Sequence, residues 1–191
     1  MQLARVHDRA HLELNSARSL GLLEMYRDQP REALPWLEMA GAAAQRRTGG
    51  EGVLPLTVKA MHWWARGLAG ELDAARAGLA ALREPITAIT GAESIEELAR
   101  RLYAGELAHE AGDHAGTIAE LREALRIGDA VPRLAQSSFV HQCRIILGAS
   151  LLAQSAGDAQ ARQLIEDGIA GLTARDMGWH PWVSRGQSLL R

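Results

Sequence analysis

Cysteine is scarce in this sequence, and long apolar runs are missing from it. Cys143 is the sole cysteine, which excludes an internal disulfide bond and gives no reason to expect an oxidising compartment. Residues 1–28 carry a charge every few positions, so they have neither the apolar core of a signal peptide nor the length of a membrane span. We therefore expect a cytoplasmic protein that makes no contact with a membrane.

A large excess of charge of one sign is also missing. The chain of 191 residues has 21 basic and 23 acidic residues, and its formal net charge is -2. Such a balance does not attract phosphate backbones or anionic lipid. Lys59 is the only lysine, and we interpret the abundance of arginine as the coding bias of a GC-rich genome rather than as a binding patch. We expect no direct contact between this segment and nucleic acid.

The alternating pattern of β-strands is absent, whereas apolar residues recur at spacings of three and four. Leu14, Ala17 and Leu20 show the pattern near the N-terminus, and Leu98 and Leu102 show it further on. The pattern predicts an all-α protein with about eight helices and a C-terminal tail. Gly and Pro interrupt it at 27–30, 47–55, 69–71, 83–94, 111–113, 128–132 and 155–158.

Four of the expected helices share one internal pattern. Each carries three small or apolar residues, the second four positions after the first and the third three positions further on. The first residues of these triplets recur at a period of about 42 residues. One helical hairpin cannot bury its apolar face alone, so the repeat predicts hairpins stacked on their neighbours. The triplets are Ala33, Leu37 and Ala40; Ala75, Leu79 and Leu82; Thr117, Leu121 and Ala124; and Ala161, Ile165 and Gly168.

Short Gly-Asp breaks mark two of the expected turns. At Gly112-Asp113 and Gly157-Asp158 we expect the glycine to end one helix in a left-handed conformation and the aspartate to cap the next. The tail holds Trp179 and Trp182, and it serves either as a cap on the last hairpin or as a dimer contact. The whole chain, 1–191, is expected to form a single domain, with hairpins at about 2–48, 52–84, 93–128 and 132–175 and a capping segment at 179–191.

Two stretches resemble tetratricopeptide repeats: "LGLLEMYRDQPREALPWLEMA" (20–40) and "AGELAHEAGDHAGTIAELREAL" (104–125). The resemblance covers nearly the whole chain and implies a right-handed α-α superhelix of about four hairpins with a C-terminal capping helix. Two features depart from the family pattern. The period exceeds the roughly 34 residues of the common repeat. Trp63 stands where Gly21, Gly105 and Gly148 stand in the other hairpins, which predicts a shifted register in the second hairpin.

The C-terminal stretch 144–191 resembles the end of the helical arrays found in LuxR-type regulators and related signal-transducing ATPases. That resemblance implies a non-catalytic protein-interaction or effector-sensing domain of a bacterial transcriptional regulator. The chain has no G-x-x-x-x-G-K-[ST] phosphate loop, and no recognition helix follows Arg191. We therefore expect the sensor of such a regulator without its ATPase or its DNA reader. A free-standing scaffold that bridges proteins or self-associates is the alternative.

The resemblance also implies a binding groove, because the first helix of each tetratricopeptide hairpin lines the concave face. The mixture of side chains expected there suits a protein or peptide partner, or a small-molecule effector of middle polarity. A homo-oligomer is a further option. Of Trp63 and Trp64, which point about 100° apart on a helix, one is expected in the core and the other in the groove. The expected groove residues are Asn15, Arg18, Leu22, Tyr26, Trp64, Leu68, Glu106, His109, Gln142 and Ile145.

One cluster of ionisable side chains raises the question of catalysis. His109, Glu110, Asp113 and His114 lie within a few positions, as an acid–base or metal site would require. They straddle an expected turn, however, so their side chains need not converge. We interpret the cluster as the joint between two helices.

Other candidates for chemistry are weaker. His7 and His11 are four residues apart and would share a helix face, but a third metal ligand is missing. Cys143 and His141 are two apart, so they point in different directions on a helix. No G-x-S-x-G elbow occurs. We expect no catalytic residue, no metal ligand and no cofactor, and a metal-dependent enzyme is the least favoured alternative.

Overall fold

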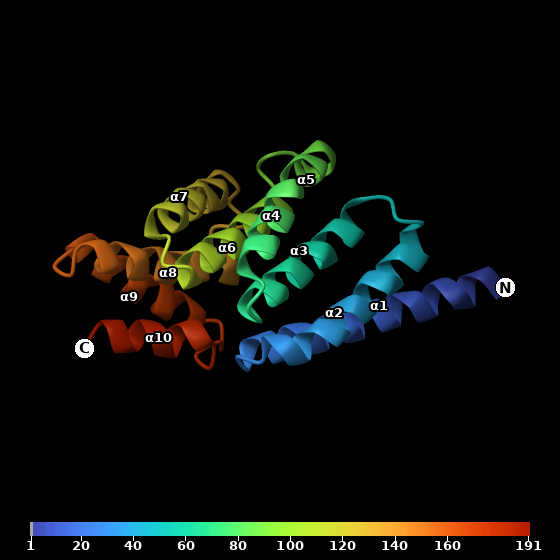
Figure 1. Cartoon of the computed structure of the whole chain (residues 1–191), viewed down its shortest axis with the longest axis horizontal. Helices are drawn as coiled ribbons and strands as arrows, with labels where there is room; N and C mark the ends of the chain where they lie inside the picture. The colour runs from blue at the N-terminus through green and yellow to red at the C-terminus, as the bar shows by residue number, and fades with distance from the viewer. Residues whose placement is uncertain (1) are drawn as a thin grey trace. The chain divides into compact units, whose positions relative to one another are not determined.

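The structure is a computed structural model that describes residues 2–191, with side chains described from residue 9 onward. All regular secondary structure in that part is α-helical, as the sequence pattern predicts. Figure 1 shows the helices in chain order. They are α1 (Gln2–Tyr26), α2 (Pro30–Thr48), α3 (Val53–Leu68), α4 (Leu72–Ala81), α5 (Arg83–Thr90), α6 (Ile95–Glu110), α7 (His114–Ala130), α8 (Ser138–Gln154), α9 (Ala159–Thr173) and α10 (Pro181–Leu189).

The chain folds into two compact units, Met1–Thr90 and Gly91–Arg191. The first unit holds α1 to α5, and the second holds α6 to α10. Within each unit, helices that follow one another in the chain pack side by side, as α1, α2 and α3 do in the first unit and α6, α7, α8 and α9 do in the second. Each helix thus buries its apolar face on its sequence neighbours, as in a stack of helical hairpins.

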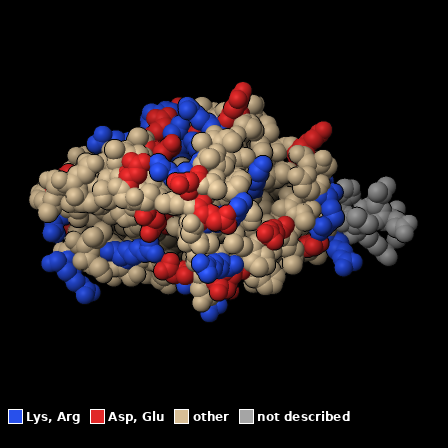
Figure 2. Space-filling view, in the orientation of Figure 1, with Lys and Arg blue, Asp and Glu red and all other residues tan. Residues whose placement is uncertain are grey.

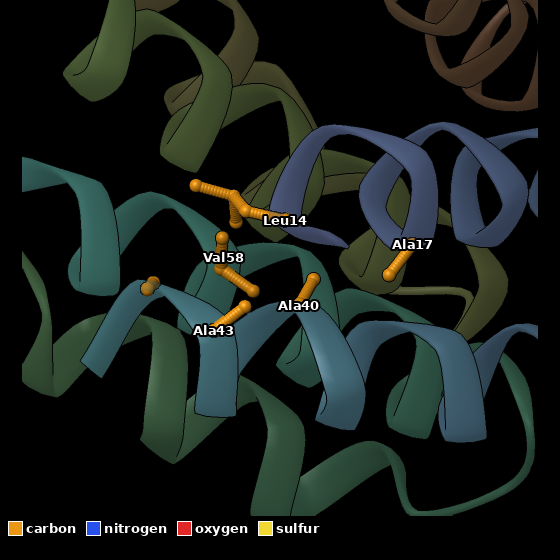
Figure 3. Packing of buried hydrophobic residues seen from close by; sticks show 6 residues of the cluster. Leu14, Ala17, Ala40, Ala43 and Val58 are labelled. Carbon is orange, nitrogen blue, oxygen red and sulfur yellow. The ribbon is translucent and has the colours of Figure 1, made fainter. Parts of the chain in front are cut away.

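The repeated triplets form the core, as predicted. All twelve triplet residues are buried, from Ala33 on α2 to Gly168 on α9. Figure 3 shows the packing in the first unit, where Leu14 of α1, Ala40 and Ala43 of α2 and Val58 of α3 belong to one buried cluster. Small side chains dominate this contact, so the helices approach one another closely.

Glycine in the first helix of a hairpin allows the second helix to pack against it. A Cβ atom on Gly21 would lie 2.8 Å from Leu37 Cγ, and one on Gly105 would lie 2.6 Å from Leu121 Cδ2. A Cβ atom on Gly148 would lie 2.6 Å from Ile165 Cγ1. In each case the contacted residue is the middle member of the triplet, so the small position and the triplet form one packing unit.

The second hairpin reverses this arrangement of large and small residues. Trp63 of α3 occupies the position of the small residue, and the glycine is on the other helix. A Cβ atom on Gly78 of α4 would overlap the Trp63 ring. The close contact is therefore displaced from Leu79, the middle triplet residue, to its neighbour. The Arg66 guanidinium also lies over the Trp63 ring, 4.6 Å from the ring centre.

One expected break is a helix. The sequence pattern places an interruption at 83–94, but α5 occupies its first eight residues, Arg83–Thr90. Pro85 is the third residue of α5, in the first turn, where backbone N–H groups have no partner within the helix, so proline is tolerated there. Ile86 is fully buried and anchors the helix.

The two Gly-Asp turns differ in one respect. Asp113 caps α7 by accepting from Gly116 N at 2.9 Å, and Asp158 caps α9 by accepting from Ala161 N at 3.0 Å. Both predicted caps are confirmed. Gly112 has φ of 72°, but Gly157 does not adopt the left-handed conformation, so that prediction is wrong. The second turn is closed instead by a hydrogen bond from Asp158 N to Ser155 O at 3.1 Å.

Charges of both signs are mixed on the face of the molecule shown in Figure 2. Acidic and basic side chains are interspersed there rather than gathered into large patches of one sign. Across the residues that the structure describes, no helix is both long enough and apolar enough to cross a membrane.

Candidate functional site

The predicted groove residues fall in both units. In the first unit Trp64 is buried with 4% of its surface exposed, whereas the others are half-buried. The side-chain amide of Asn15 lies 3.0 Å from His11 Nε2, one turn away on α1. The residues of the first unit are Asn15, Arg18, Leu22, Tyr26, Trp64 and Leu68, and those of the second are Glu106, His109, Gln142 and Ile145.

Glu106 is the centre of the second-unit group. It lies on α6 and is buried, with 4% of its surface exposed. Its Oε2 accepts a hydrogen bond from Gln142 Nε2 on α8 at 3.2 Å. Its Oε1 accepts from the indole Nε1 of Trp182 on α10 at 2.8 Å. One carboxylate therefore connects three helices, and its two bonds reduce the cost of its burial.

Trp182 fixes α10 to this face. Only 3% of its surface is exposed, and its ring meets the His109 ring edge-on with centres 5.4 Å apart. The Arg185 guanidinium lies 4.9 Å from the centre of the Trp182 ring and also bonds to Glu110 of α6 at 2.9 Å. The arrangement is a buried aromatic anchor with a charged contact at its edge, the pattern found at the centre of protein interfaces.

His109 and Ile145 lie in the same region. His109 Nδ1 is 2.8 Å from Ser150 Oγ on α8, and burial lowers the pKa of His109 below its usual value. Ile145 is fully buried, and a Cβ atom on Gly186 of α10 would lie 3.1 Å from its Cγ2. In the second unit α10 therefore covers the face that these residues were expected to line, and their role in binding stays a prediction.

The start of α10 depends on a neutral histidine. His180 is the N-cap residue, and its Nδ1 accepts a hydrogen bond from Trp182 N at 3.3 Å. Burial lowers the pKa of His180 to about 4, and the nearby Arg185 charge acts in the same direction. At neutral pH the ring is therefore uncharged and keeps the lone pair that the cap requires.

The ionisable cluster at the α6–α7 turn does not converge on one point. Asp113 caps α7, Glu110 pairs with Arg185, and His109 contacts Ser150. The His114 ring centre lies 5.8 Å from that of His109. These separate contacts agree with the interpretation of the cluster as a joint between helices.

The remaining candidates for chemistry are dispersed. Cys143 is fully buried, and burial together with the nearby Glu106 carboxylate raises the pKa of its thiol far above the usual value. The thiolate form is therefore not available at neutral pH. Within the described residues, no three His, Cys, Asp or Glu side chains gather as metal ligands would. The His7 side chain lies outside the described part.

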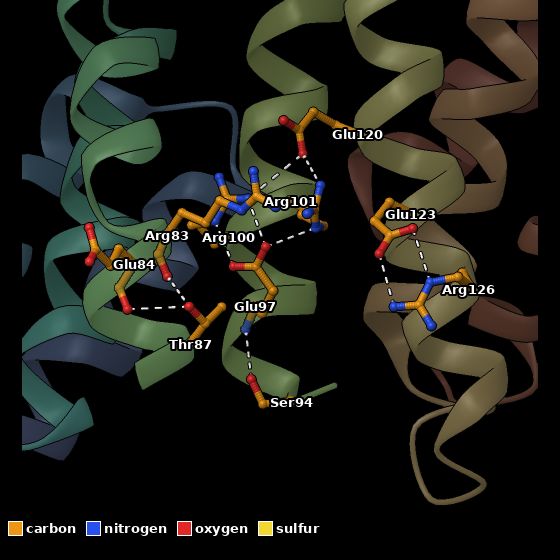
Figure 4. Close-up of polar contacts among 10 residues, drawn as sticks. All are labelled: Arg83, Glu84, Thr87, Ser94, Glu97, Arg100, Arg101, Glu120, Glu123 and Arg126. Carbon is orange, nitrogen blue, oxygen red and sulfur yellow. Dashed lines mark hydrogen bonds and ion pairs between the residues drawn. The ribbon is translucent and has the colours of Figure 1, made fainter. Parts of the chain in front are cut away.

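Sequence reasoning missed a buried ion-pair network in the second unit, shown in Figure 4. Arg100 Nε lies 2.7 Å from Glu97 Oε2, and both side chains are at most 3% exposed. Arg101 of α6 bonds to Glu120 of α7 at 2.8 Å. The spacing of three between Glu97 and Arg100 was the available signal. The network joins α6 to α7, and we assign it to structure rather than to binding.

No protein-family model matches the chain, and no curated protein matches it. The relation to helical-hairpin proteins therefore depends on the packing itself. Gly105 against Leu121 and Gly148 against Ile165 repeat one contact in successive hairpins, as expected of a repeat protein.

Proposed function

We propose that the chain is a non-catalytic binding module whose second unit takes an amphipathic helix on the face formed by α6 and α8. One observation carries the proposal: α10 occupies that face, with Trp182 buried and bonded to Glu106 at 2.8 Å. Binding of a helix through an aromatic anchor is a common mode of peptide recognition. The face that the tetratricopeptide resemblance assigns to ligands thus already holds a helix of the same chain.

The contacts of α10 define the partner that this face would accept. A side chain of the partner must fill the space that the Trp182 ring now occupies and donate one hydrogen bond to Glu106. A cation one turn later would replace Arg185 at Glu110. The partner is therefore a helix with Trp followed three residues later by Arg, which competes with α10 for the same site.

A competition experiment tests this function in the full chain. A fluorescein-labelled peptide copying residues 177–191 is titrated with the wild-type chain and with the Trp182→Ala chain, and its anisotropy is measured. The variant has lost its own anchor, so we expect it to bind the peptide at least about tenfold more tightly than the wild type does. Far-UV circular dichroism checks that the variant is folded.

The matched control is the same peptide with its Trp182 replaced by Ala. This peptide should bind neither chain, because the anchor is missing. If the unmodified peptide fails to bind a folded Trp182→Ala chain, the α6–α8 face is not a helix-binding face. Equal binding of both peptides would likewise contradict the assignment of Trp182 as the anchor.

We further propose that the module serves a bacterial transcriptional regulator of LuxR type, as a partner-binding or effector-sensing part. The support is the resemblance of residues 144–191, which form the greater part of α8 together with α9 and α10 in the structure. Reading the coding frame beyond both ends of the chain tests this assignment. A P-loop ATPase upstream and a helix-turn-helix downstream would support it, whereas a frame with neither would favour the scaffold alternative.

Self-association is a second candidate function, favoured by exposed leucines on α1. Leu12, Leu20 and Leu23 are 66%, 37% and 48% exposed, which is unusual for large apolar side chains on one helix. Analytical ultracentrifugation of the wild type and of the Leu12→Glu, Leu23→Glu double variant tests it. A wild-type dimer that the double variant abolishes supports self-association, and a wild type that stays monomeric at high concentration contradicts it.

A further inference from the structure

The first unit contains a pocket between α2 and α3, with a volume of about 270 Å³. That space corresponds to roughly nine water molecules at the volume each has in the liquid. Its apolar walls include Leu37 from α2 and Pro55, Leu56 and Val58 from α3. All of these residues belong to the first unit, whereas α6 and α8 belong to the second.

Gly41 keeps this pocket open. It lies inside α2, and a Cβ atom placed on it would meet nothing closer than Val58 Cγ1 at 3.9 Å. Gly21 and Gly105 are different, because their missing side chains are replaced by a leucine of the neighbouring helix. Glycine inside a helix costs about 1 kcal/mol relative to alanine. At Gly41 no side chain of a neighbouring helix packs into the space of the missing side chain, so this cost is not offset and the space beside the glycine stays empty.

Glu38 and His62 lie beside one another in the lining of the pocket, where the Glu38 side chain is 69% exposed and the His62 side chain 24% exposed. Glu38 Oε1 lies 3.7 Å from His62 Nε2, which is longer than a direct hydrogen bond. Burial lowers the pKa of His62, so its ring is neutral at pH 7, and Glu38 supplies a negative charge. A carboxylate and a neutral imidazole are both acceptors for the N–H groups of an ammonium ion.

Lys59 brings the opposite charge to the same pocket. It lies three residues before His62 on α3, so the two side chains emerge from the same side of the helix. It is also the only lysine of the chain. Its ammonium group is the natural partner for a carboxylate on a ligand whose amine lies toward Glu38.

We propose that this pocket binds a small zwitterion with an aliphatic body, of the class of the aliphatic α-amino acids. The amine lies at Glu38 and His62, the carboxylate at Lys59, and the aliphatic side chain against Leu37 and Val58 over Gly41. The inference is independent of the helix-binding function proposed for the second unit, and each can fail without the other.

Isothermal titration calorimetry on the full chain tests the ligand class. The probes are L-leucine, L-valine and L-methionine, together with two analogues of leucine that lack one charge each: isoamylamine, without the carboxylate, and 4-methylpentanoate, without the amine. At least one of the three amino acids is expected to bind. Each analogue is expected to bind at least about tenfold more weakly than leucine, because it has lost one charge-assisted contact. If none of the three amino acids binds at millimolar concentration, the proposal is wrong. An analogue that binds as tightly as leucine overturns the zwitterion class.

Three variants locate the binding site. Gly41→Leu fills the pocket and should abolish binding, whereas Ala42→Leu, at the adjacent exposed position of α2, should leave it unchanged. Lys59→Met should weaken leucine by about tenfold and leave isoamylamine unaffected, and Glu38→Gln should weaken both. Circular dichroism confirms that each variant is folded. If leucine still binds to Gly41→Leu, or if neither charge variant weakens its binding, the ligand lies elsewhere and the proposal is wrong. If Gly41→Leu does not fold, the two charge variants alone decide whether the ligand binds in this pocket.

Discussion

At the scale of single residues, glycine has two opposite uses in these helices. Gly105 allows α7 to approach α6, because a Cβ atom there would lie 2.6 Å from Leu121 Cδ2. Gly41 lies beside open space, with Val58 Cγ1 at 3.9 Å. Both are helical glycines with the same intrinsic penalty, so the difference between them is entirely one of packing.

Substitution of these two glycines by alanine should therefore change stability in opposite directions. We expect Gly105→Ala to lower the free energy of unfolding by about 1–3 kcal/mol through overpacking. Gly41→Ala should raise it by roughly 1 kcal/mol, because the gain in helix propensity meets no clash. Urea denaturation followed by circular dichroism measures both. The same sign for the two variants would contradict this account.

The buried pair of Glu97 and Arg100 is the other decisive feature at this scale. Both side chains are almost fully buried, with Nε and Oε2 2.7 Å apart. We expect Arg100→Met to lower the free energy of unfolding by about 1–3 kcal/mol, because the buried Glu97 carboxylate loses one of its two arginine partners and keeps only Arg101, at 2.8 Å. The matched control is Arg126→Met, which removes an exposed pair with Glu93 and Glu123 and should change stability far less. Equal losses in the two variants, measured by urea denaturation, would be incompatible with this role of burial.

At the scale of helices, the N-cap residues determine where several of them begin. Asp113, Ser137 and Asp158 each accept a hydrogen bond from the third residue that follows, and each starts a helix. His180 caps α10 in a related way, since its neutral ring accepts from Trp182 N, the second residue that follows, so the start of α10 depends on protonation in acid. The α6–α8 face is built on helices of this kind, since Ser94 caps α6 and Ser137 caps α8. The helices that line the pocket, α2 and α3, begin without a side-chain cap.

The histidine cap predicts a pH dependence for α10. The pKa of His180 is about 4 in the folded chain against 6.5 for an exposed histidine, so between these values the unfolded form binds more protons. The contribution of His180 to the free energy of unfolding is fully present above about pH 6.5. It is lost as the pH falls toward 4, and the loss is roughly 3 kcal/mol at most. We expect the melting temperature, followed by far-UV circular dichroism, to be lower at pH 5 than at pH 7. In His180→Asn, which keeps a capping side chain without this titration, the difference between the two pH values should shrink; an unchanged difference would exclude His180 as the cause.

At the scale of the whole molecule, the chain consists of two compact units. Leu37 in the first unit and Leu121 in the second occupy the same place in the repeat, each at most 1% exposed against a first-helix glycine. The equivalence of these sites is the clearest sign that one packing unit recurs along the chain. A right-handed superhelix running through all four hairpins remains a prediction.

Equivalent truncations should affect the units separately. We expect Leu37→Ala and Leu121→Ala each to lower stability by about 2–5 kcal/mol, the usual cost of such a cavity. Hydrogen exchange read by mass spectrometry should show the larger loss of protection within Met1–Thr90 for the first variant and within Gly91–Arg191 for the second. Equal losses in both units for either variant would contradict this prediction.

Much of the helical architecture follows from local sequence alone. The spacing of Leu37, Leu121 and Ile165 within their triplets, and the capping aspartates Asp113 and Asp158, are visible without a structure because helix periodicity and capping act over a few residues. Residues 83–90 were misjudged for a related reason. Proline and glycine suggest a break, but only the packing of a residue such as Ile86 determines whether a short helix forms there.

The candidate sites depended on contacts that sequence spacing does not contain. Trp182 and Glu106 are 76 residues apart, and nothing local shows that α10 folds back over the face that Glu106 was expected to line. Gly41 resembles Gly21 as a residue, yet one borders a pocket and the other a leucine. The sequence by itself determined the helices, their repeat and their core residues, because these obey short-range periodicity. Only the tertiary structure decided which faces are covered and which remain open, because that depends on the volumes of side chains brought together from distant parts of the chain.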